Sequence, residues 1–553
     1  MENTNISEKH RQELLSLCEQ VRASGTIEPH EVALLENFIS SVRYGLRFEK
    51  HEERVDRELR DNFPVFIDVT DKEICCKPGD KFNFLLEGDN LHSLKLLEKT
   101  HKGRIDVIYI DPPYNTGNEF VYNDKIVGRD DGYRHSKWLS FMAERLSIAH
   151  QLLSDRGVIF ISIDDNEQAN LKLLCDNIFG EENFLPMVSR ISKRSSNNGN
   201  YFSPCVDYIL SYTKKENGPK NFIVSLTDDI KKRYKKVDEF VEQRGPYQEI
   251  GLFQSALKHG GSRYPIECPD GSFVITPDGK PWRWNESTFH KNKNDGFVVF
   301  KKTKTSPLLN CNSDGDELGS TSCWNIYTKS YLYEREESGL TPKTFQEGFQ
   351  NNLGTSALKK IGVNFDFAKP VELVKFLVEI ASYKDSVVLD FFAGSGTTGQ
   401  AVLELNEEDG GNRQFILCTN NENNICEDIT YQRLKTVIAG IRQDGSTYSE
   451  GISANLKYFK CGLINREMED VDDALMEMAT SLIELENHID ASDSSIVIVY
   501  DEEELDELLD NFDDRIKHIY VSSDIATTGK QEQFLAARKV QITEIPHHYY
   551  KEV

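Results

Sequence analysis

Two short apolar runs, each ending in an acid at a sharp turn, constrain the fold of this chain most strongly. The first, RIDVIYI, stops at Asp111 before two prolines, and the second, SVVL, stops at Asp390 before a glycine-rich turn. Short, mostly apolar runs rich in β-branched residues are typical of parallel strands buried on both faces. Helical patterns accompany both runs, so the sequence predicts an α/β fold with a doubly wound sheet.

Neighbouring segments extend this sheet. GVIFISID predicts a strand over Gly157–Asp164, Phe415–Thr419 predicts another, and helices are expected over Trp138–Leu153 and Ala169–Phe179. Between the two halves of the sheet the periodicity is poor and turn pairs are frequent, as expected of a separate, irregular domain. We expect a helical N-terminal module over residues 1–60, sheet halves over 61–183 and 355–453, the irregular domain over 184–354, and an acidic helix with a small α/β domain over 454–553.

Composition narrows the class of protein. The 553 residues carry 65 Lys and Arg against 91 Asp and Glu, a net charge of −26 that would repel a polyanion at long range. Much of the acid follows Glu467, however, whereas Arg190–Lys236 is rich in Lys and Arg, so a local basic surface can still hold nucleic acid. The 11 cysteines form no repeated Cys-x-x-Cys unit, which predicts reduced thiols and no metal. No apolar run reaches membrane-spanning length and the N-terminus is polar, so we expect a cytoplasmic protein.

The tetrapeptide Asp111-Pro112-Pro113-Tyr114 has a chemistry that follows from its residue types. An aromatic amine is a poor nucleophile, and two acceptors aimed at its N–H bonds make it a better one. The Asp111 carboxylate and the Pro112 carbonyl can be those acceptors, held in a stiff turn by the prolines, while Tyr114 offers a ring on which an extruded base can stack. The plainer interpretation is a strand that stops at a loop, which would be the first choice for a bare Asp-Pro-Pro.

The second turn predicts a ligand that the backbone approaches closely. Its glycines are spaced as in a dinucleotide site, but no lysine follows as a phosphate-binding loop requires, so an adenosyl ligand without phosphates fits at least as well. Glu422, after the next strand, could accept hydrogen bonds from a ribose or could equally be a solvated loop acid. The residues expected to hold the ligand are Asp390, Phe391, Phe392, Ala393, Gly394, Ser395, Gly396, Thr397 and Glu422.

Taken together, the two motifs resemble those of the DNA amino-methyltransferases. The tetrapeptide precedes the glycine turn, with the insertion between them, an order similar to the permuted β group and to type III modification subunits. The resemblance covers about residues 80–214 and 350–440. It implies a Rossmann-like methyltransferase sheet, S-adenosyl-L-methionine as cofactor, N6 of a flipped adenine in double-stranded DNA as acceptor, and no metal. Residues 61–183 would then be the catalytic half and 355–453 the cofactor-binding half.

The resemblance also assigns roles to further residues. It implies that Asp89 and Asn90 flank the active site, that Asn115 continues the catalytic loop and contacts DNA, and that Lys369 helps hold the methionine end of the cofactor. Residues 184–354 would be the target recognition domain, whose basic side chains either contact phosphates or form a solvated face. The expected phosphate contacts are Lys193, Arg194, Lys231, Lys232, Arg233, Lys235 and Lys236. Family members often have His-Glu-Tyr-Ile-Leu where this chain has VDYIL at 206–210.

Several alternatives stay open. Methylation of cytosine N4 uses the same geometry but tends to have Ser at position 111, and Cys205 is discounted as a nucleophile because it lies outside both motifs. A protein or RNA methyltransferase, an orphan regulatory methylase, a nicotinamide-dependent oxidoreductase and a non-catalytic subunit are the other rivals. Type III subunits act as dimers, so the resemblance implies a homodimer. No helicase or nuclease motif is recognisable, so any DNA cleavage would need a separate restriction subunit.

Overall fold

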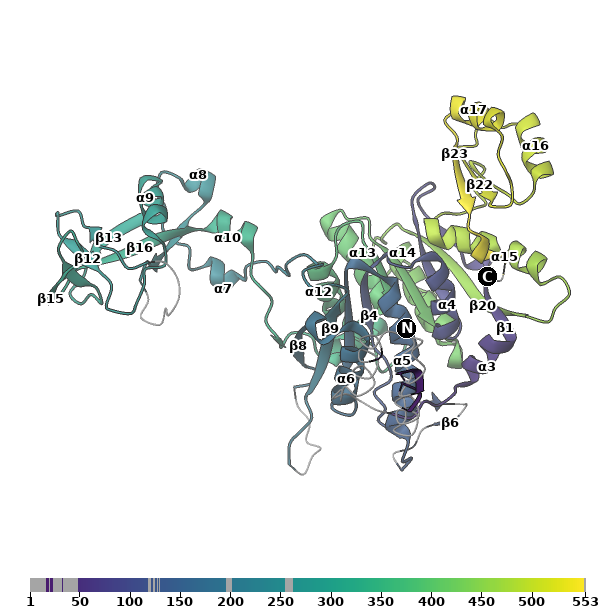
Figure 1. Cartoon of the computed structure of the whole chain (residues 1–553), viewed down its shortest axis with the longest axis horizontal. Helices are drawn as coiled ribbons and strands as arrows, with labels where there is room; N and C mark the ends of the chain where they lie inside the picture. Colours follow the sequence, from purple (N-terminus) through teal and green to yellow (C-terminus); the bar gives the residue numbers. More distant parts are fainter. Residues whose placement is uncertain are drawn as a thin grey trace. The chain divides into compact units, whose positions relative to one another are not determined.

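A computed structural model describes residues 48–117, 130–194, 201–253 and 262–551, with a few isolated positions outside these ranges (Figure 1). The helical module expected over residues 1–60 lies largely outside the described residues, and α3, Arg54–Asp61, falls at its end. The chain divides into two compact units, one made of Met1–Lys220 with Lys343–Val553 and the other of Asn221–Pro342.

The first unit is built on a sheet of eleven strands. From β20 to β7 the neighbouring strands run parallel, whereas β1 pairs antiparallel with β20, and β9 pairs antiparallel with β7 and β8. This confirms the predicted α/β class. In spatial order the strands are β1 (Asn62–Asp68), β20 (Asn455–Asn465), β3 (Phe82–Glu87), β19 (Gln414–Thr419), β18 (Val387–Asp390), β4 (Ile105–Ile110), β7 (Leu153–Ile163), β9 (Val206–Thr213), β8 (Phe184–Ile191) and β17 (Phe345–Gln346), and β2 (Ile74–Cys75) pairs with β20.

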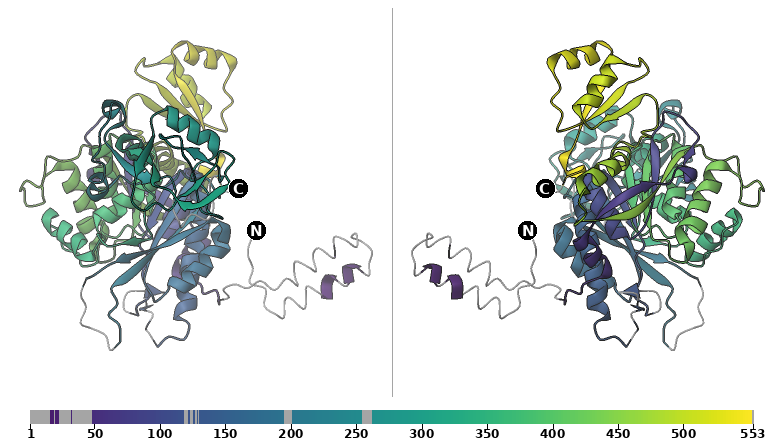
Figure 2. Two further views of the ribbon diagram at one scale, coloured as in Figure 1. Left: turned by 90° about the vertical axis from the view of Figure 1, so that its left-hand side faces the viewer. Right: turned by 90° about the vertical axis from the view of Figure 1, so that its right-hand side faces the viewer.

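Helices cover both faces of this sheet, as Figure 2 shows by the blue helices on one side and the green ones on the other. One layer contains α4 (Asn90–Thr100), α5 (Arg134–Leu152) and α6 (Gln168–Phe179), and the other α11 (Asn351–Ile361), α12 (Val371–Ala381), α13 (Thr397–Asp409) and α14 (Gln432–Ala439). Helix α12 shows why these helices pack against the sheet. Its residues Leu373, Val374, Leu377 and Val378 recur at helical spacing and are all buried.

The order of the central strands brings the two sequence motifs together. β4 and β18 are parallel neighbours, with Val107 opposite Val388. From β4 the chain continues to β7 on one side, and from β18 it continues to β19 on the other. Ligands of open α/β sheets bind in the crevice outside the carboxyl ends of strands at such a reversal. Asp111 and the glycine turn therefore share one edge of the sheet.

The boundaries differ from those expected. β8 and β9 lie within the segment expected to be a separate domain, yet they extend the large sheet, and β20 lies in the expected C-terminal segment yet joins β3. The second unit is accordingly shorter, Asn221–Pro342. Pairing between strands that are distant in the sequence leaves no local periodicity. The sequence pattern therefore did not predict that β8, β9 and β20 join the large sheet.

The second unit is regular where the sequence analysis expected irregular structure. It contains an antiparallel sheet of β10 (Tyr247–Gly251), β16 (Trp324–Tyr331) and β13 (Val298–Lys302), and another of β11 (Ile266–Glu267), β12 (Phe273–Ile275), β14 (Leu309–Cys311) and β15 (Glu317–Thr321). Trp282 is fully buried in its core. Three of these strands, β11, β12 and β14, have only two or three residues, too few to show alternation, and this obscured the regular structure. Its helices are α7 (Asp228–Lys231), α8 (Val241–Arg244), α9 (Glu286–Asn294) and α10 (Leu332–Ser338).

The C-terminal segment contributes a helix and a small sheet. α15 (Val471–Asn487) packs Leu475, Leu482 and Leu485 into the main core. A parallel sheet follows, formed by β21 (Ile496–Val499), β22 (His518–Ser522) and β23 (Gln541–Ile545), with helices α16 (Glu502–Asp510) and α17 (Gly529–Ala537). Over the part of the chain that the structure describes, no helix is both long and apolar enough to cross a membrane.

Candidate active site

A cavity of about 650 Å³ opens at the carboxyl ends of β4 and β18. All of its lining residues belong to the first unit. The tetrapeptide and the glycine turn both contribute, so the structure joins the two motifs in one site. The lining consists of Tyr109, Asp111, Pro112, Pro113, Tyr114, Thr116, Asp164, Asp165, Asn166, Ser192, Lys193, Pro204, Val206, Asp207, Asn351, Phe365, Asp366, Phe367, Lys369, Asp390, Phe392, Ala393, Gly394, Ser395 and Thr397.

The tetrapeptide is fixed by the helix that follows it. The indole Nε1 of Trp138, a fully buried residue of α5, donates to the Pro113 carbonyl at 2.7 Å. Tyr114 borders the cavity, and its hydroxyl oxygen is buried without a hydrogen-bond partner among the described residues. Burial raises the pKa of Tyr114 well above its usual value, so its ring is a neutral surface for stacking. The sequence analysis did not identify Trp138 as part of the site.

Lys369 pairs directly with the expected catalytic acid. Its Nζ donates to Oδ1 of Asp111 at 2.7 Å and to Oδ2 at 2.6 Å. The same ammonium lies 4.9 Å from the centre of the Tyr114 ring. Both side chains of the ion pair are largely shielded, with 11% of Lys369 and 24% of Asp111 exposed. Lys369 was expected to face the cofactor; it lines the cavity but holds the carboxylate of the tetrapeptide.

Asn115 is a structural residue of the loop, which contradicts its expected contact with DNA. It is fully buried with a left-handed φ of 56°, a conformation that Asn tolerates better than most residues. Its Nδ2 donates to Oε1 of Glu167 at 2.5 Å. Glu167 is buried as well, and His135 and Asn170 contact its two carboxylate oxygens at 2.6 and 2.8 Å. This network ties the end of the tetrapeptide to α5 and α6.

The glycine turn is braced from α14. Gly394 and Gly396 have φ of 50° and 73°, which a side chain would strain. The guanidinium of Arg433 is fully buried and donates from Nη1 to the Ser395 carbonyl at 3.1 Å and to the Thr397 hydroxyl at 2.8 Å. Arg433 is not among the predicted site residues. A charged residue on the apolar face of a helix, four positions before Val437, is the sequence feature that could have identified it.

Asp390 ends β18 beneath this turn. Its Oδ1 accepts from the Phe392 amide at 3.0 Å, and its Oδ2 accepts from the Thr398 hydroxyl at 2.5 Å. Burial is the main cause that raises the pKa of Asp390 to about 7, and the negative charge of Asp111 adds to it. Phe391 points into the core, whereas Phe392 lines the cavity.

Five residues expected at the cofactor site lie outside the lining of the cavity, and they are Asp89, Asn90, Phe391, Gly396 and Glu422. Asn90 donates to the Phe391 carbonyl at 2.8 Å, and Asp89 accepts from the Leu91 amide at the start of α4. Both also contact Arg145, another buried cation that the sequence analysis missed. Glu422 is exposed in the short 3-10 helix η3, Glu422–Asn424. Asn90 thus holds the segment before the glycine turn, and Asp89 and Asn90 both contact Arg145 outside the cavity lining.

The family-variant segment at 206–210 supplies a buried ion pair. Asp207 on β9 borders the cavity, and its Oδ1 accepts from Nε of Arg190 on β8 at 2.7 Å. Arg190 also donates to the Phe349 carbonyl at 2.7 Å and to Asn351 at 2.8 Å, at the start of α11. Arg190 was counted only as part of a basic stretch, but it is fully buried and cannot contact phosphates.

The expected phosphate contacts divide into two groups. Lys193 and Arg194 are exposed in the first unit, and Lys193 borders the cavity. In the second unit three lysines already have carboxylate partners, at 2.6 Å for Lys231 with Glu336, 3.0 Å for Lys232 with Asp229, and 2.5 Å for Lys236 with Glu249. Arg233 and Lys235 are exposed there.

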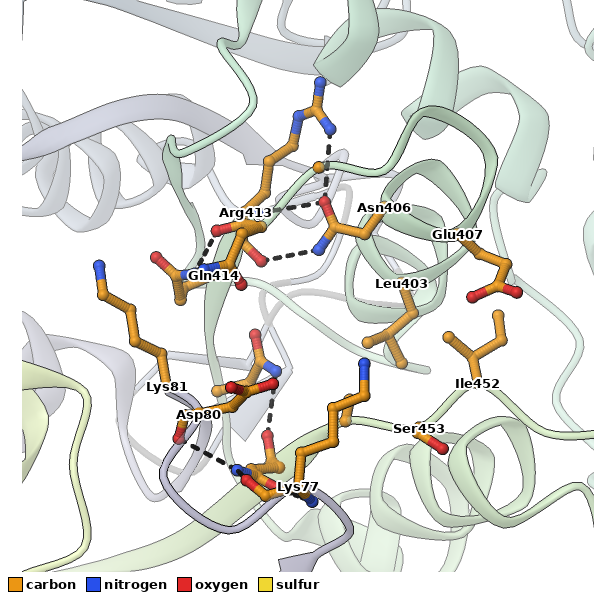
Figure 3. Close-up of a pocket in the computed structure, with 15 residues that line it drawn as sticks. Lys77, Asp80, Lys81, Leu403, Asn406, Glu407, Arg413, Gln414, Ile452 and Ser453 are labelled. Atoms are coloured by element: carbon orange, nitrogen blue, oxygen red, sulfur yellow. Dashed lines mark hydrogen bonds between the residues drawn. The ribbon is translucent and has the colours of Figure 1, made fainter.

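A smaller pocket of about 100 Å³ lies at the opposite ends of the strands, where Gln414 begins β19 and Asn455 begins β20. Figure 3 shows its polar lining, with Lys77, Asp80 and Lys81 on one side. It contains neither motif and is small beside the first cavity. No group of His, Cys, Asp and Glu within the described ranges could hold a metal ion.

The site can now be compared with known proteins. A family model described as DNA methylase matches residues 105–432, which includes both motifs. The chain is 36% identical over 400 residues to the type III StyLTI Mod subunit of Salmonella typhimurium, in an alignment that covers 65% of this chain and 57% of the relative. It is 35% identical over 393 residues to the type III EcoPI Mod subunit of Escherichia phage P1, with 62% of this chain and 58% of the relative covered.

A third relative is covered almost completely. The chain is 32% identical over 398 residues to the type II methyltransferase M.KpnI of Klebsiella pneumoniae, with 68% of this chain and 90% of the relative covered. By contrast, the chain spans less than two thirds of the length of the two Mod subunits. The family model and these relatives confirm the predicted resemblance: the chain belongs to the DNA methylase family.

Proposed function

We propose that this protein transfers a methyl group from S-adenosyl-L-methionine to N6 of an adenine flipped out of double-stranded DNA. The observation that carries this proposal is the meeting of Asp111 and the glycine turn at Gly394 in one cavity of about 650 Å³. Methyl transfer needs the acceptor amine and the donor side by side, since bringing two reactants together removes much of the entropic barrier.

The residues of the turn suit an adenosyl cofactor. A Cβ built on Gly394 would have only the Phe392 carbonyl oxygen within 4 Å, at 3.8 Å, so this glycine borders open space in the cavity. Phe392 provides an aromatic wall, and Lys369 a cation that suits the carboxylate of the methionine moiety. When bound, S-adenosyl-L-methionine supplies an electrophilic methyl group on a sulfonium.

The protein's own residues prepare the acceptor. Asp111 accepts an N–H of the adenine amine and stabilises the positive charge that grows on N6. The Pro112 carbonyl accepts the other N–H, and the contact of Trp138 with Pro113 keeps this turn rigid. The Tyr114 ring stacks on the flipped base, which offsets part of the few kcal/mol that flipping costs.

Incubation with labelled S-adenosyl-L-methionine and unmethylated genomic DNA, followed by digestion to nucleosides, tests this function. Label in N6-methyl-2′-deoxyadenosine that disappears with Asp111→Ala is the expected result. Label in N4-methylcytosine would refute the choice of base, and label in protein or RNA competitors would refute DNA as substrate. Equilibrium binding of NAD in place of S-adenosyl-L-methionine would instead support an oxidoreductase.

The similarity to type III Mod subunits supports further parts of the proposal. We propose a homodimer that acts on DNA in the cytoplasm, with a separate restriction subunit supplying any cleavage and the second unit, Asn221–Pro342, selecting the target sequence. An orphan methylase is the alternative. Co-purification of a helicase or nuclease encoded beside this chain favours the first, and sizing of the purified protein by light scattering tests the dimer.

A further inference from the structure

The ion pair between Lys369 and Asp111 conflicts with the chemistry proposed for Asp111. Both carboxylate oxygens already accept from the Lys369 ammonium, at 2.7 and 2.6 Å. The ammonium also lies 4.9 Å from the centre of the Tyr114 ring, on which the base is proposed to stack. Lys369 therefore occupies the place where the N6 amine must bind.

A base cannot easily displace this lysine by itself. The adenine amine is a neutral donor, whereas the ammonium carries a full positive charge that also attracts the Asp111 carboxylate electrostatically. Shielding adds to the difference, because only 11% of the Lys369 side chain and 24% of the Asp111 side chain are exposed. Release of Asp111 requires another anion within reach of Lys369.

Five other carboxylates line the cavity. Asp164 accepts from the side-chain amide of Asn166 at 2.8 and 2.9 Å, and Asp366 is exposed to solvent, where water and salt screen its charge. Asp207 is held by Arg190, and Asp165 accepts from the Tyr208 hydroxyl at 2.8 Å. Asp390 is buried, and its two carboxylate oxygens already accept from the Phe392 amide and the Thr398 hydroxyl. The cofactor of the proposed reaction, in contrast, carries a carboxylate on its methionine moiety.

The backbone of Lys369 is held beside the glycine turn, between α13 and α11. Its carbonyl accepts from the Thr397 hydroxyl, at the end of the glycine turn, at 3.4 Å. On its other side α11 packs so closely that a Cβ on Gly354 would lie 2.7 Å from the Lys369 carbonyl carbon. The side chain thus starts beside the turn and reaches across the cavity to Asp111.

We propose that Lys369 exchanges partners, leaving Asp111 for the carboxylate of the cofactor, so that cofactor binding frees Asp111 to receive the base. Lys369 is then a positioning residue that couples occupancy of the cofactor site to readiness of the base site. This inference rests on the proposed function and extends it to the order of binding.

The exchange can be measured without DNA by calorimetric titration of the full chain with two probes. S-adenosylhomocysteine carries the carboxylate but no sulfonium charge, and 5′-methylthioadenosine lacks the amino-acid moiety. In Asp111→Asn, Lys369 is released in advance, so S-adenosylhomocysteine should bind about tenfold more tightly, equal to about 1.4 kcal/mol, while 5′-methylthioadenosine binds as before. Asp111→Ser, which removes the same charge, should behave alike.

A Lys369 variant tests whether the gain in affinity depends on this lysine. In Lys369→Met the affinity for S-adenosylhomocysteine should fall, and addition of Asp111→Asn should then change nothing. Lys375→Met removes a lysine of α12, the helix that begins two residues after Lys369. Lys375 pairs with Glu408 away from the cavity, so this variant should leave the effect of Asp111→Asn intact. A tenfold gain that persists without Lys369, or no gain in either Asp111 variant, would overturn the exchange. Failure of the wild-type chain to bind either probe would overturn the proposed function itself.

Discussion

Replacement of Trp138 by Phe tests whether the tetrapeptide depends on its single indole hydrogen bond. The ring stays in the buried layer of α5, but the donor that reaches the Pro113 carbonyl at 2.7 Å is lost. Removal of one partner from a buried hydrogen bond costs about 1–3 kcal/mol. Because Pro113 directly follows Pro112 and lies two positions after Asp111, a shift of the turn should also slow chemistry, by up to about 100-fold for a displacement near 1 Å.

Three measurements separate these effects. Single-turnover methyl transfer should fall by roughly 10- to 100-fold, urea unfolding should show a stability loss of about 1–3 kcal/mol, and the affinity for S-adenosylhomocysteine should stay within about twofold of wild type because the glycine turn is untouched. Tyr212→Phe is the matched control. It removes a buried hydroxyl that donates to Asp176 at 2.8 Å, away from the cavity, and should lower stability with no change in rate.

The methyl-transfer rate of Trp138→Phe decides whether the hydrogen bond to Pro113 contributes to catalysis. If Trp138→Phe loses stability as Tyr212→Phe does but transfers methyl groups at the wild-type rate, the hydrogen bond to Pro113 is only structural. The rigidity proposed for the turn would then have another source.

Three further changes have defined outcomes. Burial raises the pKa of Asp390 to about 7, so the wild type loses stability as the pH rises from the usual carboxyl pKa of about 4 to about 7. In urea unfolding, the stability of Asp390→Asn relative to the wild type should therefore increase between about pH 4 and pH 7, and a constant difference would contradict this. Arg433→Lys keeps the charge but not the planar fork at Ser395 and Thr397, so calorimetry should show S-adenosylhomocysteine binding weakened roughly tenfold; unchanged affinity would count against the bracing role. Lys193→Ala should weaken binding to DNA of any sequence and reduce the slope of log affinity against log salt by about 1, and a sequence-dependent loss would argue for base contact instead.

The sequence predicted what depends on local pattern. The strands that lead to Asp111 and Asp390 are mostly apolar and almost entirely buried, so their run length and composition were sufficient. The joining of the tetrapeptide and the glycine turn followed from the rule that parallel strands present their carboxyl ends on one edge. Both motifs do line one cavity.

Contacts between distant segments could not be predicted in this way. Lys369 and Asp111 are 258 positions apart, and nothing in either segment indicates the pair. Asn115 was expected to face DNA because it follows the tetrapeptide, but its positive φ turns it toward the buried Glu167. A buried cation such as Arg433 becomes recognisable only when a helical pattern is read for charges on its apolar face.

A crystal structure of the chain with S-adenosylhomocysteine tests the central claim most directly, which is that one cavity serves both the cofactor and the base. The account predicts the ligand beside Gly394 and Phe392, with its methionine carboxylate on Lys369 and with Asp111 open toward Tyr114. A ligand bound in the pocket at the opposite ends of the strands, or one that leaves the Lys369–Asp111 pair intact while filling the space over Tyr114, would contradict it.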